Sequence, residues 1–256
     1  MELFQLTGKV ALVTGGTRGV GQMIARGLLQ AGAERLYISS RKAEEGERAA
    51  AELSRHGEVR YINADLSSEE ECVRLARELE EREERLHILV NNAGATWGAP
   101  LEEFPASAWE KVLNINLKAP FFLTRACLPL LRAAATDEDP ARVINVGSIE
   151  GLRVPDLEIY SYAASKAGVH HLTRVLARRL GADRITVNAI APGPFPSKMM
   201  RATLEAFGEQ IAASAALGRI GRPDDIAGTA IYLASRAGAY TTGAIIPVDG
   251  GIWAAR

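Results

Sequence analysis

Short apolar runs alternate along the chain with longer stretches in which apolar residues recur at helical spacing. The runs predict buried strands at residues 9–13, 35–39, 59–63, 87–90, 142–146, 184–190 and 244–248. The longer stretches predict helices, the first carrying Met23 and Leu28 and ending at Gly32, the others at 43–55, 67–85, 107–134, 160–180 and 223–235. This alternation, unbroken by a linker, predicts one doubly wound α/β domain over 1–256, with a mainly parallel, seven-stranded Rossmann-type sheet.

Residues 194–219 follow neither period, and we interpret them as a substrate lid. Apolar side chains in and around this stretch either line a mouth suited to an acyl chain or simply pack the lid. These side chains are Trp97, Leu152, Val154, Pro155, Leu157, Phe195, Met199, Met200 and Phe207.

A glycine-rich turn joins the first predicted strand to the first helix. Its sequence is Thr14-Gly-Gly-Thr-Arg-Gly-Val-Gly21, with glycines at the spacing that lets backbone N–H groups approach a pyrophosphate at the start of a helix. A strand, a glycine turn and a helix in this order indicate a dinucleotide-binding site. The turn supplies the candidate cofactor-binding residues Gly15, Thr17, Arg18, Gly19, Val20 and Gly21.

The end of the second strand bears on the choice of dinucleotide. A site for NAD usually has an acid here that binds the ribose 2′-hydroxyl, whereas this chain has Ser39-Ser40-Arg41. Arg18 and Arg41 are two guanidinium groups without an acid, a combination that suits a 2′-phosphate, so we favour NADP(H). The alternative is that both arginines are merely solvated surface residues.

Tyr162 and Lys166 lie four residues apart in a predicted helix, so they share one of its faces. A nearby ammonium group favours the phenolate and should lower the tyrosine pKa, giving a phenol that exchanges a proton near neutral pH. Tyr160 cannot play this part, because the residue four positions on is Ala164. Four residues lie just after predicted strands: Gly15, Asn91, Ser148 and Pro192. The helix that carries Tyr162 begins near the same edge of the sheet. Sheets of this kind bind ligands at the carboxyl ends of their strands.

Composition excludes several classes of function. The net charge of −1 argues against a nucleic-acid partner, and no stretch predicts a signal peptide or membrane span. Cys72 and Cys127 are isolated and fit reduced core residues of a cytoplasmic protein. The four histidines lack ligand spacing, so no metal is expected, and His170 and His171 are interpreted as a solvated helix face. The charge run at 78–85 is interpreted as an exposed helix.

Several motifs in order resemble the short-chain dehydrogenase/reductase family, over about residues 9–251, and within it the β-ketoacyl reductases. They are the glycine turn, Asp65, Asn91-Asn-Ala-Gly94, Asn116, Ser148, Tyr162 with Lys166, Pro192-Gly193 and Asp249-Gly-Gly251.

The resemblance implies four catalytic residues. Tyr162 exchanges a proton with a substrate carbonyl, Lys166 stabilises the phenolate and holds ribose hydroxyls, and Ser148 polarises the carbonyl. Asn116 supports a proton-relaying water, with Asn114 as a competing assignment. The resemblance also implies that the adenosine half of the cofactor meets Ser40, Asp65, Leu66, Asn92, Ala93 and Gly94, and that Ile190, Pro192, Gly193 and Ser197 flank the nicotinamide.

The implied activity is NADPH-dependent reduction of a small-molecule carbonyl, best matched by a 3-oxoacyl group on acyl carrier protein or CoA, in a homodimer or homotetramer. The alternatives are a sugar, polyol or steroid alcohol dehydrogenase and a cofactor-binding sensor that does no chemistry. Arg174, Arg178, Arg179 and Arg184 either dock an acidic carrier or form an ordinary charged face.

Several motif residues also have purely structural interpretations. Asp65 can cap the following helix, Asn91 can tie strand ends together, and Ser148 can cap a turn. Asp249-Gly-Gly251 is interpreted as a structural turn after the last strand.

Overall fold

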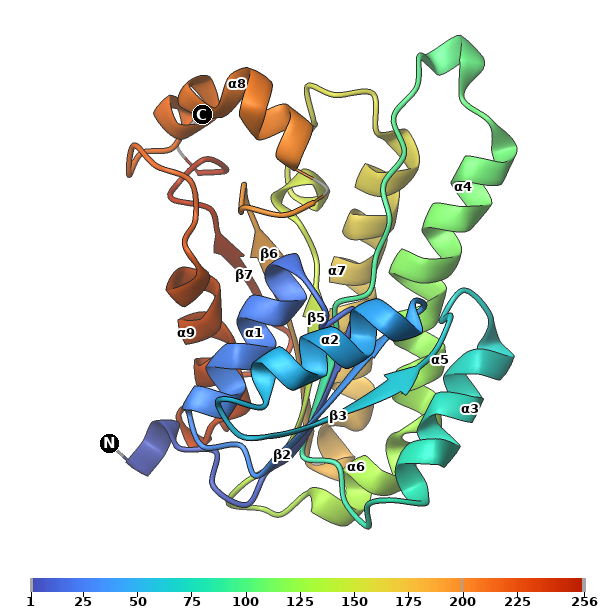
Figure 1. Ribbon diagram of the computed structural model, residues 1–256, viewed down its shortest axis with the longest axis vertical. Helices are drawn as coiled ribbons and strands as arrows, with labels where there is room; N and C mark the ends of the chain where they lie inside the picture. Colours follow the sequence, from blue (N-terminus) through green and yellow to red (C-terminus); the bar gives the residue numbers. More distant parts are fainter. Residues whose placement is uncertain (1, 199, 255–256) are drawn as a thin grey trace.

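The computed structural model describes residues 2–198 and 200–254 (Figure 1). The strands are β1 (Val10–Thr14), β2 (Arg35–Ser40), β3 (Glu58–Asn63), β4 (Ile88–Asn91), β5 (Ala141–Val146), β6 (Ile185–Pro192) and β7 (Ile245–Val248). The helices are α1 (Gly19–Gln30), α2 (Ala43–Leu53), α3 (Glu69–Glu80), α4 (Ala106–Leu113), α5 (Ala119–Ala126), α6 (Leu128–Ala134), α7 (Tyr160–Leu180), α8 (Arg201–Ser214) and α9 (Pro223–Ala234).

The strands form one seven-stranded sheet in the order β3-β2-β1-β4-β5-β6-β7. Every pair is parallel, so the Rossmann-type prediction is confirmed and the sheet is parallel throughout rather than mainly so. The strand order reverses between β1 and β4, and the crevice at such a reversal is where doubly wound sheets bind ligands. The glycine turn and the start of α7 both lie at that edge (Figure 1).

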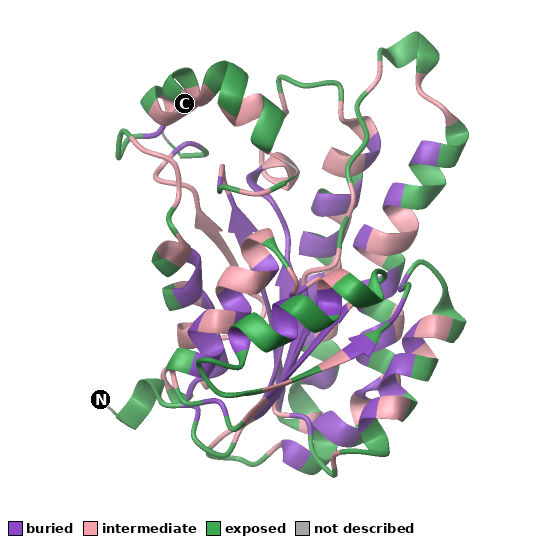
Figure 2. Ribbon diagram, in the orientation of Figure 1, coloured by how far each residue is buried: buried purple, intermediate pink, exposed green. Residues whose placement is uncertain are grey.

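Helices cover both faces of the sheet. On one face α1, α2 and α9 pack around Ile24, Leu36 and Ile226. On the other face α3, α5, α6 and α7 pack around Leu75, Leu123 and other fully buried side chains. The central strands are buried along their whole length (Figure 2), which explains why they appear in the sequence as continuous apolar runs rather than alternating ones.

The predicted helix over 107–134 is broken in the structure. A π-helical turn, Asn114–Lys118, separates α4 from α5, and Cys127 separates α5 from α6. Pro120 lies in the first turn of α5, where its missing N–H leaves no hydrogen bond unmade. The change of helix type therefore falls just before Pro120.

The helix predicted over 67–85 ends early. Ser68 caps the helix by accepting the Glu71 N–H at 3.3 Å, and the helix stops at Glu80. Beyond it, the side chain of Glu83 is only 8% exposed and accepts hydrogen bonds from Arg35 at 2.6 Å and from the Tyr37 hydroxyl at 2.7 Å. The interpretation of 78–85 as a wholly exposed helix is wrong, because Glu83 is the buried partner of these two groups.

Residues 194–219 contain α8, and Met199 lies outside the described residues. Phe195 is buried in the core beneath α9 and packs so closely on Gly221 that a side chain there would lie 2.4 Å from its ring. Phe195 therefore packs the lid rather than lining a mouth. After α7, the left-handed backbone falls on Arg184 (φ 57°) and not on Gly181, which begins a further helical turn.

Candidate active site

The glycine turn packs too closely to accommodate side chains. Gly15 and Gly19 have φ of +63° and +55°, a region that favours glycine. A Cβ added at Gly21 would lie 2.3 Å from Asn92 Nδ2 and 2.4 Å from the Gly15 carbonyl oxygen. Asn92 Nδ2 itself donates to the carbonyls of Thr14 and Gly15, at 2.9 and 3.1 Å. The predicted residues of the first and fourth strand ends thus form one compact unit.

Thr14 organises this unit, and sequence reasoning missed it. Its buried hydroxyl accepts the N–H groups of Asn92 and Ala93 at 2.9 and 3.0 Å and donates to the Val90 carbonyl at 3.3 Å. Asn91 donates to Thr124 and Asn145, so it ties strands and helices together as one interpretation had it. A threonine at the end of a buried strand, just before the glycine turn, was the signal available in the sequence.

The residues expected at the 2′-phosphate lie at the end of β2. Ser40 and Arg41 are there, and Arg18 reaches across from the glycine turn to pair with Glu45 at 3.2 Å. Lys42 pairs with the same carboxylate at 2.9 Å. Hydrogen bonding to Lys42, with the charges of Arg18 and Lys198, lowers the Glu45 pKa. Neither Lys42, Glu45 nor Lys198 was singled out from sequence, yet Lys42 and Lys198 join Arg18 in placing positive charge around Glu45.

Asp65 and Leu66 follow β3. Leu66 is buried, whereas Asp65 is exposed and accepts the Ser67 N–H at 3.2 Å, which makes it the start of a turn before α3. The residue that caps α3 is Ser68. Asp65 is therefore not the helix cap; it orders the turn before the helix and remains exposed at the edge of the sheet.

The nicotinamide-side residues lie at the end of β6. Gly193 donates to the Val248 carbonyl at 3.0 Å, and a Cβ on it would lie 2.7 Å from that of Asp249. Ser197 lies over the glycine turn, 3.1 Å from the position of a Cβ on Gly19. Asp249 accepts the N–H groups of Gly251 and Trp253, which confirms its interpretation as a structural turn.

Ser148, Tyr162 and Lys166 come together where β5 meets the start of α7. Burial raises the Tyr162 pKa and outweighs the hydrogen bond from Ser148, which favours the phenolate; the charge of Glu150 adds a smaller increase. Lys166 is 5% exposed, and its Nζ donates to the Val146 carbonyl at 2.7 Å. Burial lowers the Lys166 pKa to about 8. Ser148 also caps the turn Ile149–Gly151, as its alternative interpretation proposed.

The prediction that Lys166 lowers the Tyr162 pKa is wrong, because that pKa is raised. Lys166 Nζ lies 5.5 Å from the centroid of the Tyr162 ring and is directed to a backbone carbonyl. Its charge is itself disfavoured by burial, so it does not offset the desolvation of the phenol. Tyr162 is therefore a protonated phenol, in the state required of a general acid.

Asn116, rather than Asn114, is buried against α7. Its side-chain oxygen accepts the Ala95 N–H at 2.8 Å, and its amide donates to the Ala95 carbonyl and the Ser165 hydroxyl, both at 2.9 Å. Asn114 lies instead in a hollow with Leu66 and Ser68 at the start of α3. Both residues belong to the π-helical turn, whose widened backbone lets Asn116 turn toward the strand ends.

His170 was wrongly expected on a solvated face. Its side chain is 3% exposed, and its Nε2 lies 3.5 Å from the Ser148 backbone nitrogen. His171 is exposed, as expected. The sequence held the relevant signal, because His170 is four residues beyond Lys166 and therefore on the buried face of the same helix.

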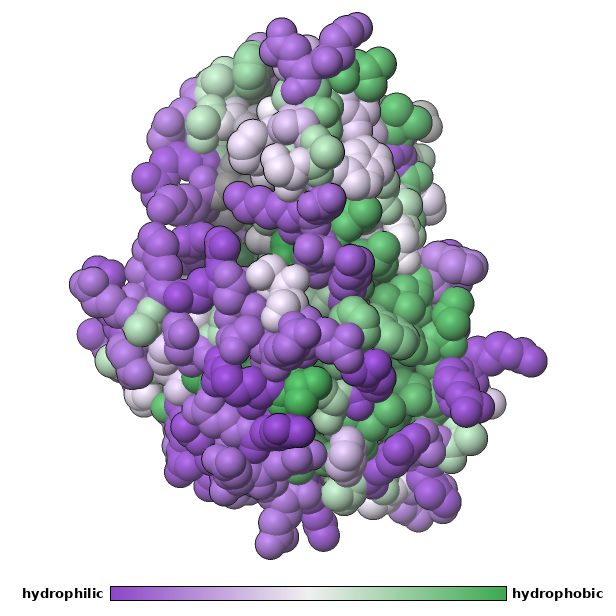
Figure 3. All heavy atoms as spheres, turned by 90° about the vertical axis from the view of Figure 1, so that its right-hand side faces the viewer, coloured by the Kyte–Doolittle hydropathy of each residue, from purple (hydrophilic) through white to green (hydrophobic). Residues whose placement is uncertain are grey.

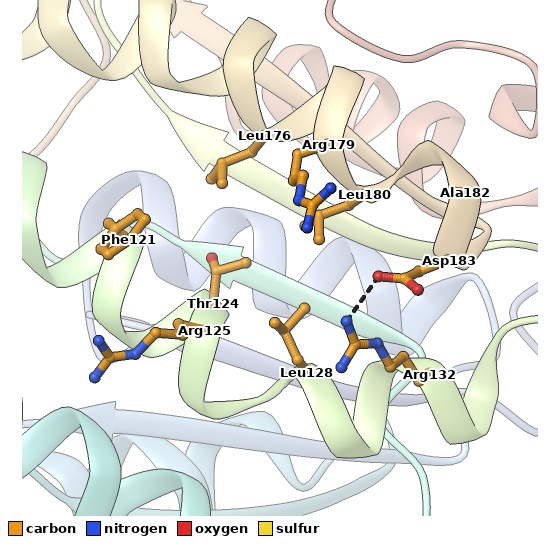
Figure 4. Close-up of a pocket in the computed structure, with 10 residues that line it drawn as sticks. All are labelled: Phe121, Thr124, Arg125, Leu128, Arg132, Leu176, Arg179, Leu180, Ala182 and Asp183. Atoms are coloured by element: carbon orange, nitrogen blue, oxygen red, sulfur yellow. Dashed lines mark hydrogen bonds and ion pairs between the residues drawn. The ribbon is translucent and has the colours of Figure 1, made fainter.

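A separate cavity of about 360 Å³ lies between α7 and the helices α5 and α6 (Figure 4). Leu128, Leu176 and Leu180 form its apolar part, and Arg132 pairs with Asp183 at its edge at 2.9 Å. None of the residues predicted to be catalytic or to bind cofactor lines it. Among the described residues, no group of three or more His, Cys, Asp or Glu is arranged to hold a metal ion. None of the helices in the described part of the chain is long and apolar enough to cross a membrane.

The chain is similar to known reductases and dehydrogenases over nearly its whole length. A family model described as enoyl-(acyl carrier protein) reductase matches residues 15–253. The chain is 52% identical over 250 residues to the rhamnolipids biosynthesis 3-oxoacyl-[acyl-carrier-protein] reductase of Pseudomonas aeruginosa, covering 97% of each chain. It is 35% identical to the 2-dehydro-3-deoxy-D-gluconate 5-dehydrogenase of Pseudoalteromonas atlantica, with all of both chains covered.

The structural comparison agrees with the sequence comparison. The Pseudomonas aeruginosa RhlG/NADP active-site complex superposes with a TM-score of 0.95 at 50% identity, covering 99% of both chains. Motifs that suggest likeness to the rhamnolipid enzyme are Gly21–Ile24, Thr96–Gly98, Pro140–Ile144 and Ala191–Ser197.

Proposed function

This chain belongs to the short-chain dehydrogenase/reductase family, and from that we propose that it is an NADPH-dependent reductase of 3-oxoacyl thioesters. The observation that carries the proposal is the meeting of Ser148, a protonated Tyr162 and Lys166 beside the glycine turn. A serine hydroxyl and a tyrosine hydroxyl that lie close together can both bind one carbonyl oxygen, and the tyrosine can protonate it.

The residues present fit a dinucleotide. The turn around Gly15, Gly19 and Gly21 leaves no room for side chains and offers backbone N–H groups at the start of α1. Arg18, Arg41 and Lys42 bring positive charge to the end of β2, as a 2′-phosphate requires. The end of β6 with Ser197 would border the nicotinamide, and Lys166 would turn from Val146 to the ribose hydroxyls. When bound, NADPH supplies the hydride.

Proton delivery falls to the chain's own residues. The Tyr162 hydroxyl gives its proton to the carbonyl oxygen of the substrate, which with the hydride at carbon completes the alcohol. The Ser148 hydroxyl donates to the same oxygen and holds it in place. The phenolate left on Tyr162 would be stabilised by Lys166 once its ammonium group turns to the ribose hydroxyls, and it regains a proton through Lys166 and solvent near Asn116. Glu150, which raises the Tyr162 pKa, favours the acid role of the phenol.

An apolar rim supports an acyl substrate. The Ala99 N–H donates to the Glu158 carbonyl at 3.2 Å and so joins the segments that carry Trp97 and Leu157. Trp253 donates to the Leu152 carbonyl at 3.3 Å and extends the rim toward the lid. Trp97, Val154 and Leu157 are 40%, 89% and 60% exposed, more apolar surface than a sugar acid would use.

The sugar-acid dehydrogenase alternative is supported by the likeness to the 2-dehydro-3-deoxy-D-gluconate 5-dehydrogenase of Pseudoalteromonas atlantica. NADPH oxidation measured with acetoacetyl-acyl carrier protein, acetoacetyl-CoA and 5-ketogluconate separates the two. We expect turnover of the thioesters, with the carrier protein preferred; turnover of 5-ketogluconate alone would refute 3-oxoacyl reduction.

The chemistry is tested with a matched pair of tyrosines. Tyr162→Phe should lose turnover and keep NADPH binding, because the phenyl ring fills the same space without the proton. Tyr160→Phe should stay active, since among the described residues the Tyr160 hydroxyl bonds to Glu158, at 3.0 Å, and the phenyl ring keeps its contact with Phe104. Equal activity of both variants would remove Tyr162 from the proposed role.

We further propose that two copies pair through α5 and α7. Apolar side chains gather on the side of the molecule on which α4 and α5 lie (Figure 3), and Phe121 and Val175 are 38% and 50% exposed. Light scattering should detect a dimer or tetramer, and Phe121→Lys with Val175→Lys should yield monomers. Leu101→Lys, at a distant exposed site, is the control.

Two further expectations remain proposals of the same kind. We propose that residues 194–219, joined to the glycine turn through Ser197, act as the substrate lid. A cytoplasmic location is supported by the two free and buried cysteines.

A further inference from the structure

Three side chains of α7 fasten the end of β5. The Thr173 hydroxyl accepts the Asn145 amide at 2.9 Å, and Lys166 donates to the Val146 carbonyl at 2.7 Å. Between them along the helix, His170 receives the Ser148 backbone N–H on Nε2 at 3.5 Å, a long hydrogen bond. One helix therefore holds the end of β5 through the Asn145 side chain and through two backbone groups, the Val146 carbonyl and the Ser148 N–H.

His170 makes close contact with this backbone. A Cβ added to Gly147 would lie 2.0 Å from His170 Nε2 and 2.6 Å from its neighbouring ring carbon. The ring thus takes the space that a side chain at position 147 would need. The side chain is 3% exposed, and within the described residues its Nδ1 makes no hydrogen bond.

The environment of His170 selects one charge state. Nε2 can accept an N–H only when it carries no proton, so the ring is neutral with its proton on Nδ1. Lys166, one turn before His170, and Arg174, one turn after it, both disfavour a positive charge on the ring. Of the neighbouring groups, the backbone of Gly151 is the one that favours the cation. Burial is the largest influence and lowers the pKa of His170 to about 4. The acceptor is therefore preserved at neutral pH.

We propose that His170 is a positioning residue for the reaction, holding Ser148 by accepting its backbone N–H so that the hydroxyl faces Tyr162. This rests on the proposed carbonyl reduction. Without an acceptor, the buried Ser148 N–H would lose its partner, and the segment Gly147–Ser148 could rotate. A shift of well under 1 Å at Ser148 is enough to slow a proton transfer that depends on its alignment.

The test compares two replacements of similar size. His170→Met fills the space but lacks a strong acceptor, whereas His170→Gln can offer its amide oxygen. We expect kcat for the thioester to fall about tenfold in His170→Met, with KM for substrate and Kd for NADPH within twofold, because only alignment at the reacting carbonyl is disturbed. His170→Gln should recover most of kcat. His171→Met, at the adjacent exposed residue, should match the wild type.

A second measurement uses the wild-type protein and needs neither an activity assay nor a folded variant. With ¹⁵N-labelled histidine, the NMR signals of His170 should show the Nδ1–H tautomer, unchanged between pH 5.5 and 8. A wild-type protein that shows this tautomer and binds NADPH but reduces no carbonyl would refute the proposed function and leave the contact with Ser148 established. An Nε2–H tautomer, wild-type kcat in His170→Met, or a loss of NADPH affinity as large as the loss of kcat would each overturn the positioning role.

Discussion

Replacement of Gly21 by alanine offers a quantitative test of the close packing between the glycine turn and Asn92. The new methyl group would lie 2.3 Å from Asn92 Nδ2 and 2.4 Å from the Gly15 carbonyl oxygen, and the latter is backbone that cannot move aside on its own. Overpacking of this kind destabilises by about 1–3 kcal/mol. Displacing Asn92 also breaks two hydrogen bonds, at 2.9 and 3.1 Å, each contributing about 0.5–1.5 kcal/mol. The expected loss in the free energy of unfolding is therefore about 2–6 kcal/mol.

A second helical glycine provides the control. Nothing lies within 4 Å of a Cβ added to Gly228, which is exposed in α9, so Gly228→Ala should stabilise by about 0.5–1 kcal/mol through helix propensity alone. Urea unfolding followed by circular dichroism measures both variants, and fluorescence of bound NADPH measures the site. If Gly21→Ala unfolds at the same urea concentration as Gly228→Ala and binds NADPH normally, the inferred packing of the turn is wrong.

Three further predictions address cofactor choice, acid stability and the thiols. Arg18→Ala and Arg41→Ala should each weaken NADPH binding with little effect on NADH, and Arg55→Ala, at another exposed arginine, should change neither; equal effects on both dinucleotides would contradict a 2′-phosphate site. Burial lowers the pKa of His87 to about 4, and that of His170 likewise, from an ordinary 6.5. Between these two pKa values the unfolded chain binds more protons than the folded protein, so Tm should fall as the pH is lowered from 6.5 toward 4. The fall should be less steep in His87→Gln. A Tm that does not change with pH in this range would count against neutral buried histidine rings. Burial raises the pKa of Cys72 and Cys127 to about 12, so a disulfide reagent should label them only after unfolding; rapid labelling of the native protein would disprove their burial.

The sequence was most informative where one local rule determines structure. Apolar runs predicted the seven strands to within a residue or two, because strands covered by helices on both faces must be apolar throughout. The helical spacing of Tyr162 and Lys166 predicted their shared face, and glycine spacing predicted the crowded turn. Each of these is a property of residues near one another in the chain.

The predictions from sequence were wrong where burial, pKa or ion pairing depends on residues far apart in the chain. Periodicity placed His170 and His171 together, but only the packing of β5 on α7 decides which one is buried. The Tyr162 pKa depends on how burial, Ser148, Glu150 and the direction of Lys166 combine, and the spacing of two residues cannot give that balance. Glu45 lay unnoticed in a charged helix until the fold brought Arg18 to it.

The order of strands in the sheet also shapes how the chain can fold. As the chain leaves the ribosome, β1, β2 and β3 can associate with α1 and α2, but the neighbour of β1 on its other side is β4, where Ala11 meets Ile88. Until β4 is synthesised, β1 has an unpaired edge, and the cluster that contains Val10 and Leu12 is completed only by helices that come later still. Closing so large a loop is entropically slow. We therefore expect the nascent chain to expose apolar surface on β1 until β4 and the later helices are synthesised, and any dependence on chaperones to be greatest before residue 180.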